Sequence, residues 1–519
     1  MQRITILAIL LLGGAGPLVH ADELWLPSIF SEKMVLQRDM PLPIWGKAAP
    51  GAKVTVALYK NNDRTQPLAE GSAAAAADGG RWRVDLKAVP VQKRCALLVT
   101  AEGPDKKRAE RRLFDNVRVG EVWITCGQSN SLFPLETCAD YVDALKRRCD
   151  YPLMRACAVG VRESHSVTEP QEELYSYWGL VKWNDSVWQS TRESTTDIPW
   201  GQTGLSYFFA RELTDYLGKG VPVGMVNVCA ILPVETWVAP AEIEARKELH
   251  HLRGKGYPNA TGRGFMANIM PLAPYAARGV IYYQGEMNAG RCFDYYHGLQ
   301  GVIASWRRIW KRKDMPFLVV QLPGLIGHMA KERRPSDMDA KALAAYKGGN
   351  VDHSWCYIRE AQLRVSRADP RVGLAVTIDL GERFDAHPPR KRPVAERLFL
   401  QARKLVYSDK AVVADAPAPT EFARDGKSFV VTFDGVGDGL VGKDKLAGFE
   451  LRDAAGAWRP AQASIEGNQV RVQVDGLAEP TGVRYAWAGF PPVTLYNSAG
   501  LPATPFSYPE VDLHKHQPK

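Results

Sequence analysis

The chain has 519 residues, of which 45% are hydrophobic and 24% are charged, and its formal net charge is +9 at neutral pH. This composition is that of an ordinary globular protein, which excludes a disordered or collagen-like chain, and the length predicts several domains. The densest basic stretches, Lys106-Lys107-Arg108 with Arg111-Arg112 and Arg390-Lys391-Arg392, are not interleaved with exposed aromatic residues, so we interpret them as solvated faces and expect no nucleic-acid partner.

Residues 1–21 are predicted to be a secretory signal peptide. Arg3 supplies a positive start, residues 4–12 form a short apolar core, and Val19-His20-Ala21 is typical of a cleavage site. The apolar run is too short to span a bilayer, and no other segment has the pattern of a membrane span. We therefore expect a secreted or periplasmic protein; the alternative for this stretch is a buried N-terminal strand.

Residues 22–115 alternate short β-rich runs with turns that contain Pro and Gly. Val54–Tyr59 and Trp82–Leu86 are two such runs, and Ala49-Pro50-Gly51 is one such turn. Ala73–Ala77 is expected to lie in a loop. This pattern predicts an N-terminal β-sandwich.

Residues 116–410 change to strands that alternate with amphipathic helices. Apolar residues recur at helical spacing over 205–217 and 299–310, whereas 136–200 fit the pattern least well and are expected to form a loop-rich insertion near the site. Such alternation predicts an α/β domain with a parallel sheet. The predicted strands are Val122–Thr125, Gly224–Val228, Val280–Tyr283, Phe317–Gln321 and Leu374–Ile378.

Residues 411–519 return to β character after the linker Ala416–Pro419. Ser428–Phe433 and Gln469–Val474 alternate apolar and polar side chains, as strands with one buried face do. We expect a second, C-terminal β-sandwich.

Three predicted strands of the α/β domain are each followed by a polar turn. The first turn is Gly127-Gln128-Ser129-Asn130, the second is Gln284-Gly285-Glu286-Met287-Asn288, and the third contains Asp385-Ala386-His387-Pro388. Considered alone, each residue is best interpreted as structural: Ser129 as a turn serine that hydrogen-bonds its own backbone, and His387 as a loop histidine that caps backbone carbonyls. Together the turns offer a nucleophile, a base, a carboxylate and amide donors, which are the groups that serine hydrolysis needs.

These three motifs resemble those of the sialate O-acetylesterases, which are carbohydrate esterases of the SGNH-hydrolase superfamily. The resemblance covers nearly the whole chain, because Leu26–Ser31 near the start and Leu495–Ala503 near the end are also similar to the family. It implies a flavodoxin-like SGNH hydrolase core between two β-sandwich domains. It also implies O-acetylesterase activity on an acetylated glycan or oligosaccharide, without a cofactor.

By this resemblance, Ser129 is the nucleophile, His387 the general base and Asp385 the residue that orients the base. Two residues apart on an extended segment point to the same side, so Asp385 can reach His387. Asp379 is the reserve candidate for the carboxylate.

The resemblance also assigns the oxyanion donors to the Ser129 N–H, a glycine N–H and an amide side chain. Gln284 is the expected amide, Asn288 is the second choice, and Glu286 is expected to brace the loop. Where the family has paired glycines, this chain has Ala230 and Ile231. The missing glycine raises the alternative of a catalytically weak or inactive relative that binds glycans.

A further alternative is an adhesive β-sandwich protein with the α/β region as scaffold; the combination of Ser129, Asp385 and His387 argues against it. Of the eight cysteines, Cys138, Cys149 and Cys157 are close enough for local disulfides, whereas Cys126 and Cys229 are expected to be buried thiols. No spacing of Cys or His suggests a metal site. The sequence leaves the oligomeric state open.

Overall fold

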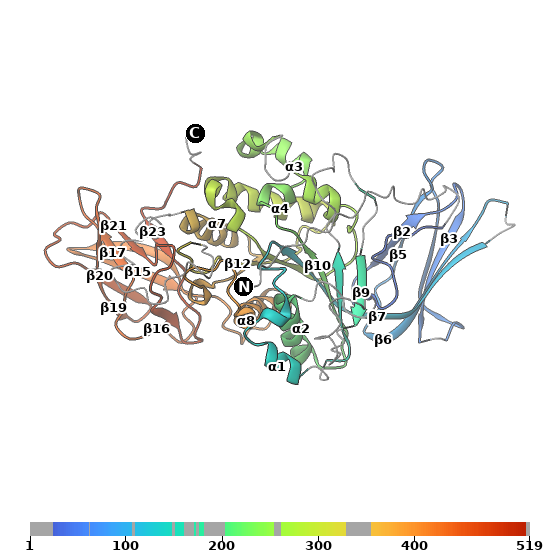
Figure 1. The fold of residues 1–519 in the computed structure, drawn as a ribbon, viewed down its shortest axis with the longest axis horizontal. Helices are drawn as coiled ribbons and strands as arrows, with labels where there is room; N and C mark the ends of the chain where they lie inside the picture. The colour runs from blue at the N-terminus through green and yellow to red at the C-terminus, as the bar shows by residue number, and fades with distance from the viewer. Residues whose placement is uncertain are drawn as a thin grey trace, which may run out of the picture.

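The computed structural model describes residues 24–61, 63–105, 109–147, 151–159, 171–172, 176–180, 203–253, 261–327 and 354–514. The predicted signal peptide and Cys149 lie outside this part of the chain. Figure 1 shows three regions along the long axis: N-terminal strands at the right, a central region of helices around a sheet, and C-terminal strands at the left.

The central sheet is built around the long strand β7 (Ala109–Gly127). In spatial order it runs β13-β12-β11-β7-β10-β8-β9, and all neighbours are parallel except β9, which is antiparallel to β8. Taken without β8 and β9, this is the 2-1-3-4-5 order of flavodoxin-like sheets, in which ligands bind where the order reverses, here between β7 and β11. The other strands are β8 (Met154–Val159), β9 (Ser176–Leu180), β10 (Val223–Cys229), β11 (Gly279–Tyr283), β12 (Phe317–Val320) and β13 (Val372–Ala375).

Helices cover both faces of this sheet, and its central strands are accordingly mostly apolar. In Figure 1, α2 (Gly204–Leu217) and α8 (Lys391–Leu405) lie below the sheet, and α4 (Tyr295–Ile309) and α7 (Ser354–Ala368) lie above it. Every residue of β10 and β11 is buried. The predicted α/β character and parallel sheet are therefore confirmed.

Two predictions about this region are wrong in part. The predicted strand Leu374–Ile378 ends at Ala375, and a 3₁₀ turn η10 (Ile378–Leu380) follows it. The predicted loop-rich insertion contains η1 (Leu135–Thr137) and α1 (Tyr141–Lys146), and also β8, which extends the sheet because its residues are apolar enough to be buried beside β10.

The N-terminal strands join the same sheet through β7. The first half of β7 pairs with β6 in antiparallel fashion, and its second half pairs with β10 and β11 in parallel. The predicted domain boundary at 115/116 thus falls inside one continuous strand, and one buried core extends across it. The remaining strands here are β1 (Val35–Gln37), β2 (Leu42–Lys47), β3 (Lys53–Lys60), β4 (Pro67–Ala74), β5 (Arg81–Leu86) and β6 (Gln92–Glu102).

The strand β4 includes Ala73 and Ala74, which were expected in a loop. They pair with Val54 and Lys53 of β3, and half-buried Ala73 and exposed Ala74 continue the alternation along this strand. The prediction of a loop over the whole alanine run is wrong at these two residues.

The C-terminal region has a separate apolar core between two four-stranded sheets. Phe429, Val431 and Phe433 alternate inward along β15, as their spacing predicts. The strands are β14 (Ala418–Asp425), β15 (Ser428–Asp434), β16 (Leu440–Gly442), β17 (Phe449–Arg452), β18 (Trp458–Pro460), β19 (Gln462–Glu466), β20 (Gln469–Gln473), β21 (Gly482–Tyr485), β22 (Leu495–Asn497) and β23 (Phe506–Tyr508).

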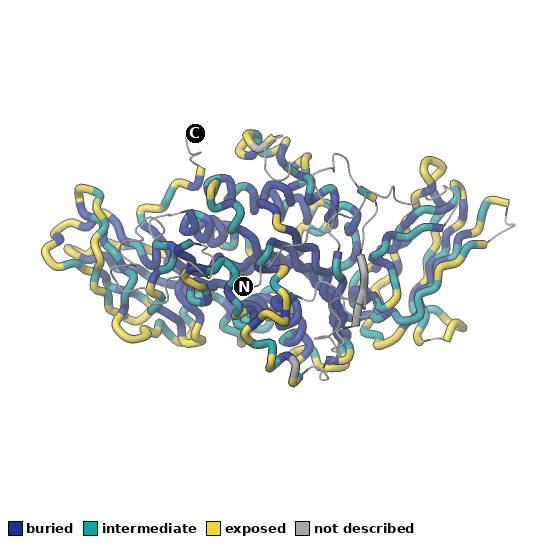
Figure 2. The backbone as a smooth tube through the Cα atoms, viewed as in Figure 1, coloured by how far each residue is buried: buried dark blue, intermediate teal, exposed yellow. Residues whose placement is uncertain are grey.

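Short helical segments lie over the central sheet beside the longer helices. They are η5 (Val234–Trp237), α3 (Pro240–Ala245), η6 (Lys247–Leu252), η7 (Phe265–Ile269) and η8 (Glu286–Asp294). Figure 2 shows that buried backbone concentrates in the central sheet and its helices, while exposed backbone concentrates in the loops at both ends.

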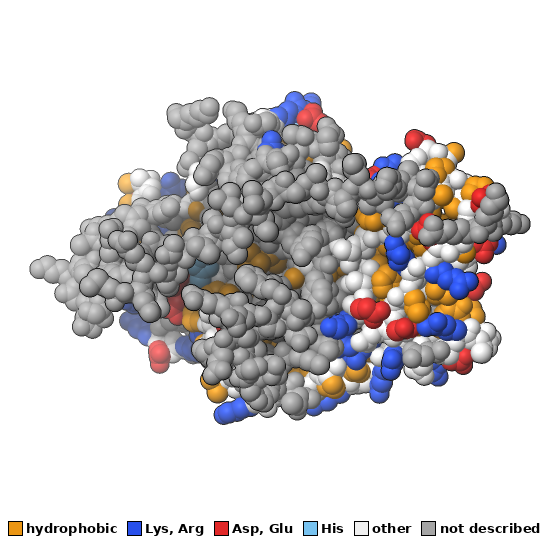
Figure 3. All heavy atoms as spheres, turned by 45° about the vertical axis from the view of Figure 1, so that its right-hand side comes forward, with side chains coloured by type: hydrophobic (Ala, Val, Ile, Leu, Met, Phe, Trp, Pro, Cys, Tyr) orange, Lys and Arg blue, Asp and Glu red, His pale blue; other side chains and the backbone are white. Residues whose placement is uncertain are grey.

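The surface charge is mixed where it is described. On the face in Figure 3, Lys and Arg side chains over the N-terminal strands alternate with Asp and Glu. None of the helices in the described ranges is both long and apolar enough to cross a membrane. The seven described cysteines are buried thiols, which confirms the prediction for Cys126 and Cys229. Among the described residues Cys138 and Cys157 do not form a disulfide with each other, and the pairs considered with Cys149 lie outside them.

Candidate active site

Ser129 lies in a turn at the carboxyl end of β7, next to the end of β11. Gly127 makes this turn possible: its φ is +151°, and a Cβ there would lie 2.0 Å from the carbonyl oxygen of Tyr283. The N–H groups of Ser131 and Leu132 both donate to the carbonyl of Gln128, at 2.9 and 3.0 Å. Within the described residues, no acceptor takes the Ser129 N–H.

Gln284 lies at the end of β11 and is fully buried. Its Nε2 donates to Asn288 Oδ1 at 2.8 Å and to Gln128 Oε1 at 3.2 Å. Asn288 is itself held, because its Oδ1 also accepts the Val234 N–H at 2.9 Å and its Nδ2 donates to Glu235 Oε2 at 3.1 Å. These bonds determine which way both amides face, and they tie the Asn288 side chain to Gln284, Val234 and Glu235.

Asp385 and His387 lie in the loop between η10 and α8. Asp385 Oδ1 accepts the backbone N–H of His387 at 2.9 Å and lies 3.6 Å from its Nδ1. The second distance is longer than a hydrogen bond, and it is short enough for a small rotation of the imidazole to close. The Asp379 carboxylate instead forms two bonds to the guanidinium of Arg397, at 2.5 and 2.8 Å, so it is already paired.

Asn130 connects the three loops. Its Nδ2 donates to Ala386 O at 2.8 Å and to Glu286 Oε1 at 2.6 Å. Ala386 lies between Asp385 and His387, and Asn130 directly follows Ser129. The structure therefore brings the Ser129 turn and the His387 loop together at the edge of the sheet where the strand order reverses.

The segment that replaces the glycine pair follows β10. The Ala230 N–H donates to Gly127 O at 3.0 Å, so this amide is occupied. The Ile231 side chain is 57% exposed, and its N–H has no acceptor within the described part of the chain. Of the two positions, Ile231 is the one whose amide is available to a ligand.

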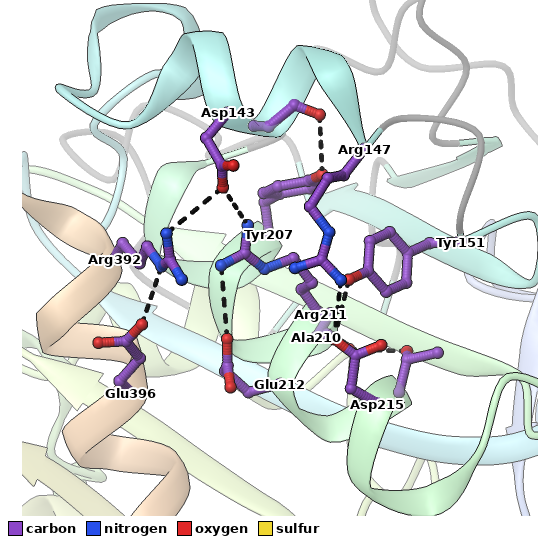
Figure 4. Close-up of polar contacts among 12 residues, drawn as sticks. Asp143, Arg147, Tyr151, Tyr207, Ala210, Arg211, Glu212, Asp215, Arg392 and Glu396 are labelled. Atoms are coloured by element: carbon purple, nitrogen blue, oxygen red, sulfur yellow. Dashed lines mark hydrogen bonds and ion pairs between the residues drawn. The ribbon is translucent and has the colours of Figure 1, made fainter.

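Lys391 was not recognised in the sequence as part of this site. As the first residue of α8 it is only 1% exposed, and its Nζ donates to Asn130 Oδ1 at 2.5 Å. The interpretation of residues 390–392 as a solvated face is therefore wrong for Lys391. It is correct for the next residue: Figure 4 shows that Arg392 reaches Asp143 and Glu396.

One signal of the burial of Lys391 was present in the sequence. Lys391 precedes Val394 and Ala395 by three and four residues, which puts it on the buried face of the helix. A lysine on an apolar helical face is normally assigned to its exposed edge, because burying an ammonium group is costly.

Two ionisable groups contact Asn130: Lys391, which is buried, and Glu286, which is partly buried. Burial lowers the pKa of Lys391 to about 8, even though the Glu286 carboxylate acts in the opposite direction. Burial also raises the pKa of Glu286, against the hydrogen bond from Asn130 and the charge of Lys391. Glu286 Oε2 is inaccessible to solvent and has no hydrogen-bond partner within the described residues.

No group of three or more His, Cys, Asp or Glu side chains in the described ranges could hold a metal ion. The chemistry that these residues offer is that of a hydroxyl, an imidazole, carboxylates and amides.

No protein-family profile matches the chain. Two curated relatives, the sialate O-acetylesterases of Pongo abelii and Homo sapiens, are each 25% identical over 509 residues, which cover 92% of this chain and 91% of each relative. A crystal structure of a carbohydrate acetylesterase from Xanthomonas citri is 29% identical, covers 93% of this chain and 99% of its own, and has a TM-score of 0.75. The resemblance to sialate O-acetylesterases that the motifs indicated is thus confirmed over nearly the whole length.

Proposed function

We propose that this chain, whose relatives are sialate O-acetylesterases, is a carbohydrate O-acetylesterase that works through an acyl-serine intermediate. Ester hydrolysis is the reaction class of its named relatives and of its structural neighbour. The observation that supports this particular site is the bond from Asn130 to Ala386, because it joins the Ser129 turn to the loop of Asp385 and His387.

The proposed mechanism begins with attack of Ser129 Oγ on the acetyl carbonyl. His387 takes the hydroxyl proton and returns it to the leaving sugar oxygen, and Asp385 stabilises the imidazolium. Water then attacks the acetyl-serine with His387 again as the base, which releases acetate and restores the serine. The partial exposure of His387 leaves the ring accessible to a substrate.

The proposed oxyanion donors are the N–H groups of Ser129 and Ile231 and the side chain of Gln284. The two amides have no acceptor within the described residues, whereas Gln284 Nε2 must release its two longer bonds, to Gln128 Oε1 at 3.2 Å and to Leu232 O at 3.5 Å, in order to donate. Ala230 drops out of this proposal because its N–H is occupied, and Asn288 becomes the support of Gln284.

We further propose that residues 1–21 direct export to the periplasm or the medium, and that residues 22–115 and 411–519 are β-sandwich domains flanking an SGNH core at 116–410. Sequencing the N-terminus of the mature protein tests the first point: a mature chain that begins at Met1 would contradict it. An N-terminal boundary inside β7 implies that residues 22–115 do not fold alone.

Acetate release tests the function. The full chain should hydrolyse p-nitrophenyl acetate and a subset of a panel of acetylated glycans, and Ser129→Ala should reduce the rate by ~10³-fold or more with an unchanged circular dichroism spectrum. Hydrolysis that survives in Ser129→Ala would contradict the assignment.

The second candidate function is a glycan-binding relative with little or no turnover. It is favoured by the occupied amide of Ala230, which leaves one fewer donor at the position of the family glycines. Acetylated glycans that bind in calorimetry without release of acetate would support this candidate over the first.

A further inference from the structure

Lys391 lies at a position where a positive charge destabilises the folded protein. It is 1% exposed, and it is the first residue of α8, where the helix dipole repels positive charge. Its neighbours in sequence behave differently, since Arg390 is exposed and Arg392 pairs with carboxylates at the surface (Figure 4). A buried ammonium in this position calls for a role other than stability.

The Lys391 side chain makes one hydrogen bond within the described residues, and it goes to the neutral oxygen of Asn130 at 2.5 Å. Aromatic rings enclose the rest of the ammonium: the centroid of Phe133 lies 4.6 Å from Nζ and that of Tyr283 lies 5.5 Å from it. Within the described residues the ammonium thus has one hydrogen-bond acceptor, with two aromatic rings beside it.

That acceptor determines how Asn130 can face. The Lys391 ammonium can only donate hydrogen bonds, so the Asn130 atom that faces it must be the acceptor Oδ1. The Asn130 Nδ2 then points to Ala386 and Glu286. An Asn130 amide turned over would put its N–H₂ against an ammonium and its oxygen against the Ala386 carbonyl and the Glu286 carboxylate. Lys391 therefore selects the orientation in which Asn130 joins the Ser129 turn to the His387 loop.

We propose that Lys391 is a positioning residue for the esterase reaction: it orients Asn130 and so holds Ser129 in line with His387. This role rests on the proposed function, because it concerns the geometry of that same site. A misplacement of about 1 Å between reacting groups can cost on the order of 10²-fold in rate.

The charge state of Lys391 should make kcat depend on pH. Its ammonium faces Glu286 of η8, Cys138 beside η1 and Asp385 of the loop before α8, with Tyr283 of β11 and Phe133 as its aromatic neighbours. Because its pKa is about 8, the ammonium becomes an amine, which can also accept a hydrogen bond, as the pH rises past that value. The orientation of Asn130 then depends on Ala386 and Glu286 without the ammonium, so kcat should fall on the alkaline side.

Replacing Lys391 by Met tests the role, with Arg392→Met as the matched control at the same end of the same helix. With p-nitrophenyl acetate, we expect Lys391→Met to lower kcat by roughly 10- to 100-fold, with a change in KM of less than about threefold, and to lack the alkaline limb. Arg392→Met should stay within about threefold of wild type, since exposed ion pairs contribute little.

The stability of the same variant separates positioning from folding. The pKa of Lys391 is about 8 in the folded chain and about 10.4 when unfolded, so the unfolded state binds more protons between these values and the contribution of Lys391 to stability rises with pH there. The difference in melting temperature between Lys391→Met and wild type should therefore be most favourable to the variant below pH 8, where wild type carries the buried charge. Lys391→Gln, which keeps an N–H donor, serves as a second variant and should recover part of kcat.

A double-mutant cycle with Asn130→Ala identifies the route. If Lys391 acts through Asn130, Lys391→Met should cost at most a few-fold more in the Asn130→Ala background. Fully multiplicative effects would overturn this route, and a Lys391→Met enzyme with the kcat and pH profile of Arg392→Met would overturn the role itself while leaving the esterase intact. A wild type that hydrolyses no ester would contradict the proposed function, and this role with it.

Discussion

The carboxylates of Asp385 and Asp379 lie close in sequence but have different partners. Asp379 is paired with Arg397 on α8, whereas Asp385 lies against the backbone N–H and the ring of His387. We predict that Asp385→Asn lowers kcat/KM by about 10²-fold or more, because a neutral partner neither stabilises the imidazolium nor selects its tautomer.

The matched variant Asp379→Asn should lower the melting temperature, since it breaks a partly buried pair with Arg397. It should lower kcat/KM less than Asp385→Asn does. Both quantities can be measured on the same preparations. The reverse ranking of the two variants in kcat/KM would mean that Asp379 orients the base.

Gln284 is the side-chain donor of the proposed oxyanion hole, and Asn288 is the amide that supports it. Loss of one such donor typically costs ~10²–10³ in rate. We predict a loss in this range or larger in kcat for Gln284→Ala, because the position of the family glycines offers only the Ile231 amide. A Gln284→Ala enzyme within a few-fold of wild type would show that the amides of Ser129 and Ile231 are sufficient.

Most of the proposed site residues could be proposed from the sequence because they lie in polar turns whose motifs resemble those of a known esterase family. Ser129, Gln284, Asp385 and His387 are of this kind. Lys391 could not be recognised, because its burial depends on what packs around the start of α8. The occupied amide of Ala230 depends on its hydrogen bond to Gly127 at the end of β7, which no local pattern encodes.

At the scale of elements, the site depends on β7 and β11 ending side by side. Gly127 permits this, since a Cβ would lie 2.0 Å from Tyr283 O and 2.4 Å from Ser131 Oγ. We predict that Gly127→Ala destabilises the protein by roughly 1–3 kcal/mol or more and abolishes activity, because backbone must move to admit the methyl group.

The control for Gly127→Ala is Gly290→Ala in η8, where a Cβ would meet no atom within 4 Å. Urea unfolding should separate the two variants clearly. Equal midpoints would show that the end of β7 is not as tightly packed as these distances indicate.

Element types in the central region were predictable because hydrophobic periodicity is strong there, as in α2, α4 and β11. The end of β13 was not, because Thr377 and Ile378 favour strand structure by propensity, whereas here the chain turns into η10. β8 was missed for a related reason: its pairing with β10 depends on a distant part of the chain rather than on its own pattern.

At the scale of the whole molecule, the two ends attach differently. The N-terminal strands share β7 and one core with the central sheet, whereas the C-terminal sheets have their own core. Both ring contacts and hydrogen bonds join them to the central region, such as the contact of Tyr357 with Trp487. Arg359 of α7 is fully buried and donates to carbonyls of both parts: Leu322 and Pro323 after β12, and Ala488 and Gly489 of the C-terminal region.

Arg359→Met should weaken the attachment of the C-terminal region. Each buried carbonyl left without a donor costs roughly 1–3 kcal/mol, so we predict a lower melting temperature and faster protease cleavage between residues 406 and 417. Arg367→Met is the control, since Arg367 also contacts the C-terminal region, at Pro419 and Asp434, but is more exposed. Equal cleavage rates for the two variants would contradict a special role of Arg359.

The central claim is that Ser129 is the nucleophile activated by His387, and covalent labelling tests it most directly. The full chain is treated with a fluorophosphonate, which forms a stable adduct with an activated serine, and the modified peptide is identified by mass spectrometry. We predict one adduct, on Ser129, which forms much more slowly in His387→Ala and is absent in Ser129→Ala. An enzyme that hydrolyses p-nitrophenyl acetate but carries the adduct on another serine would contradict the account.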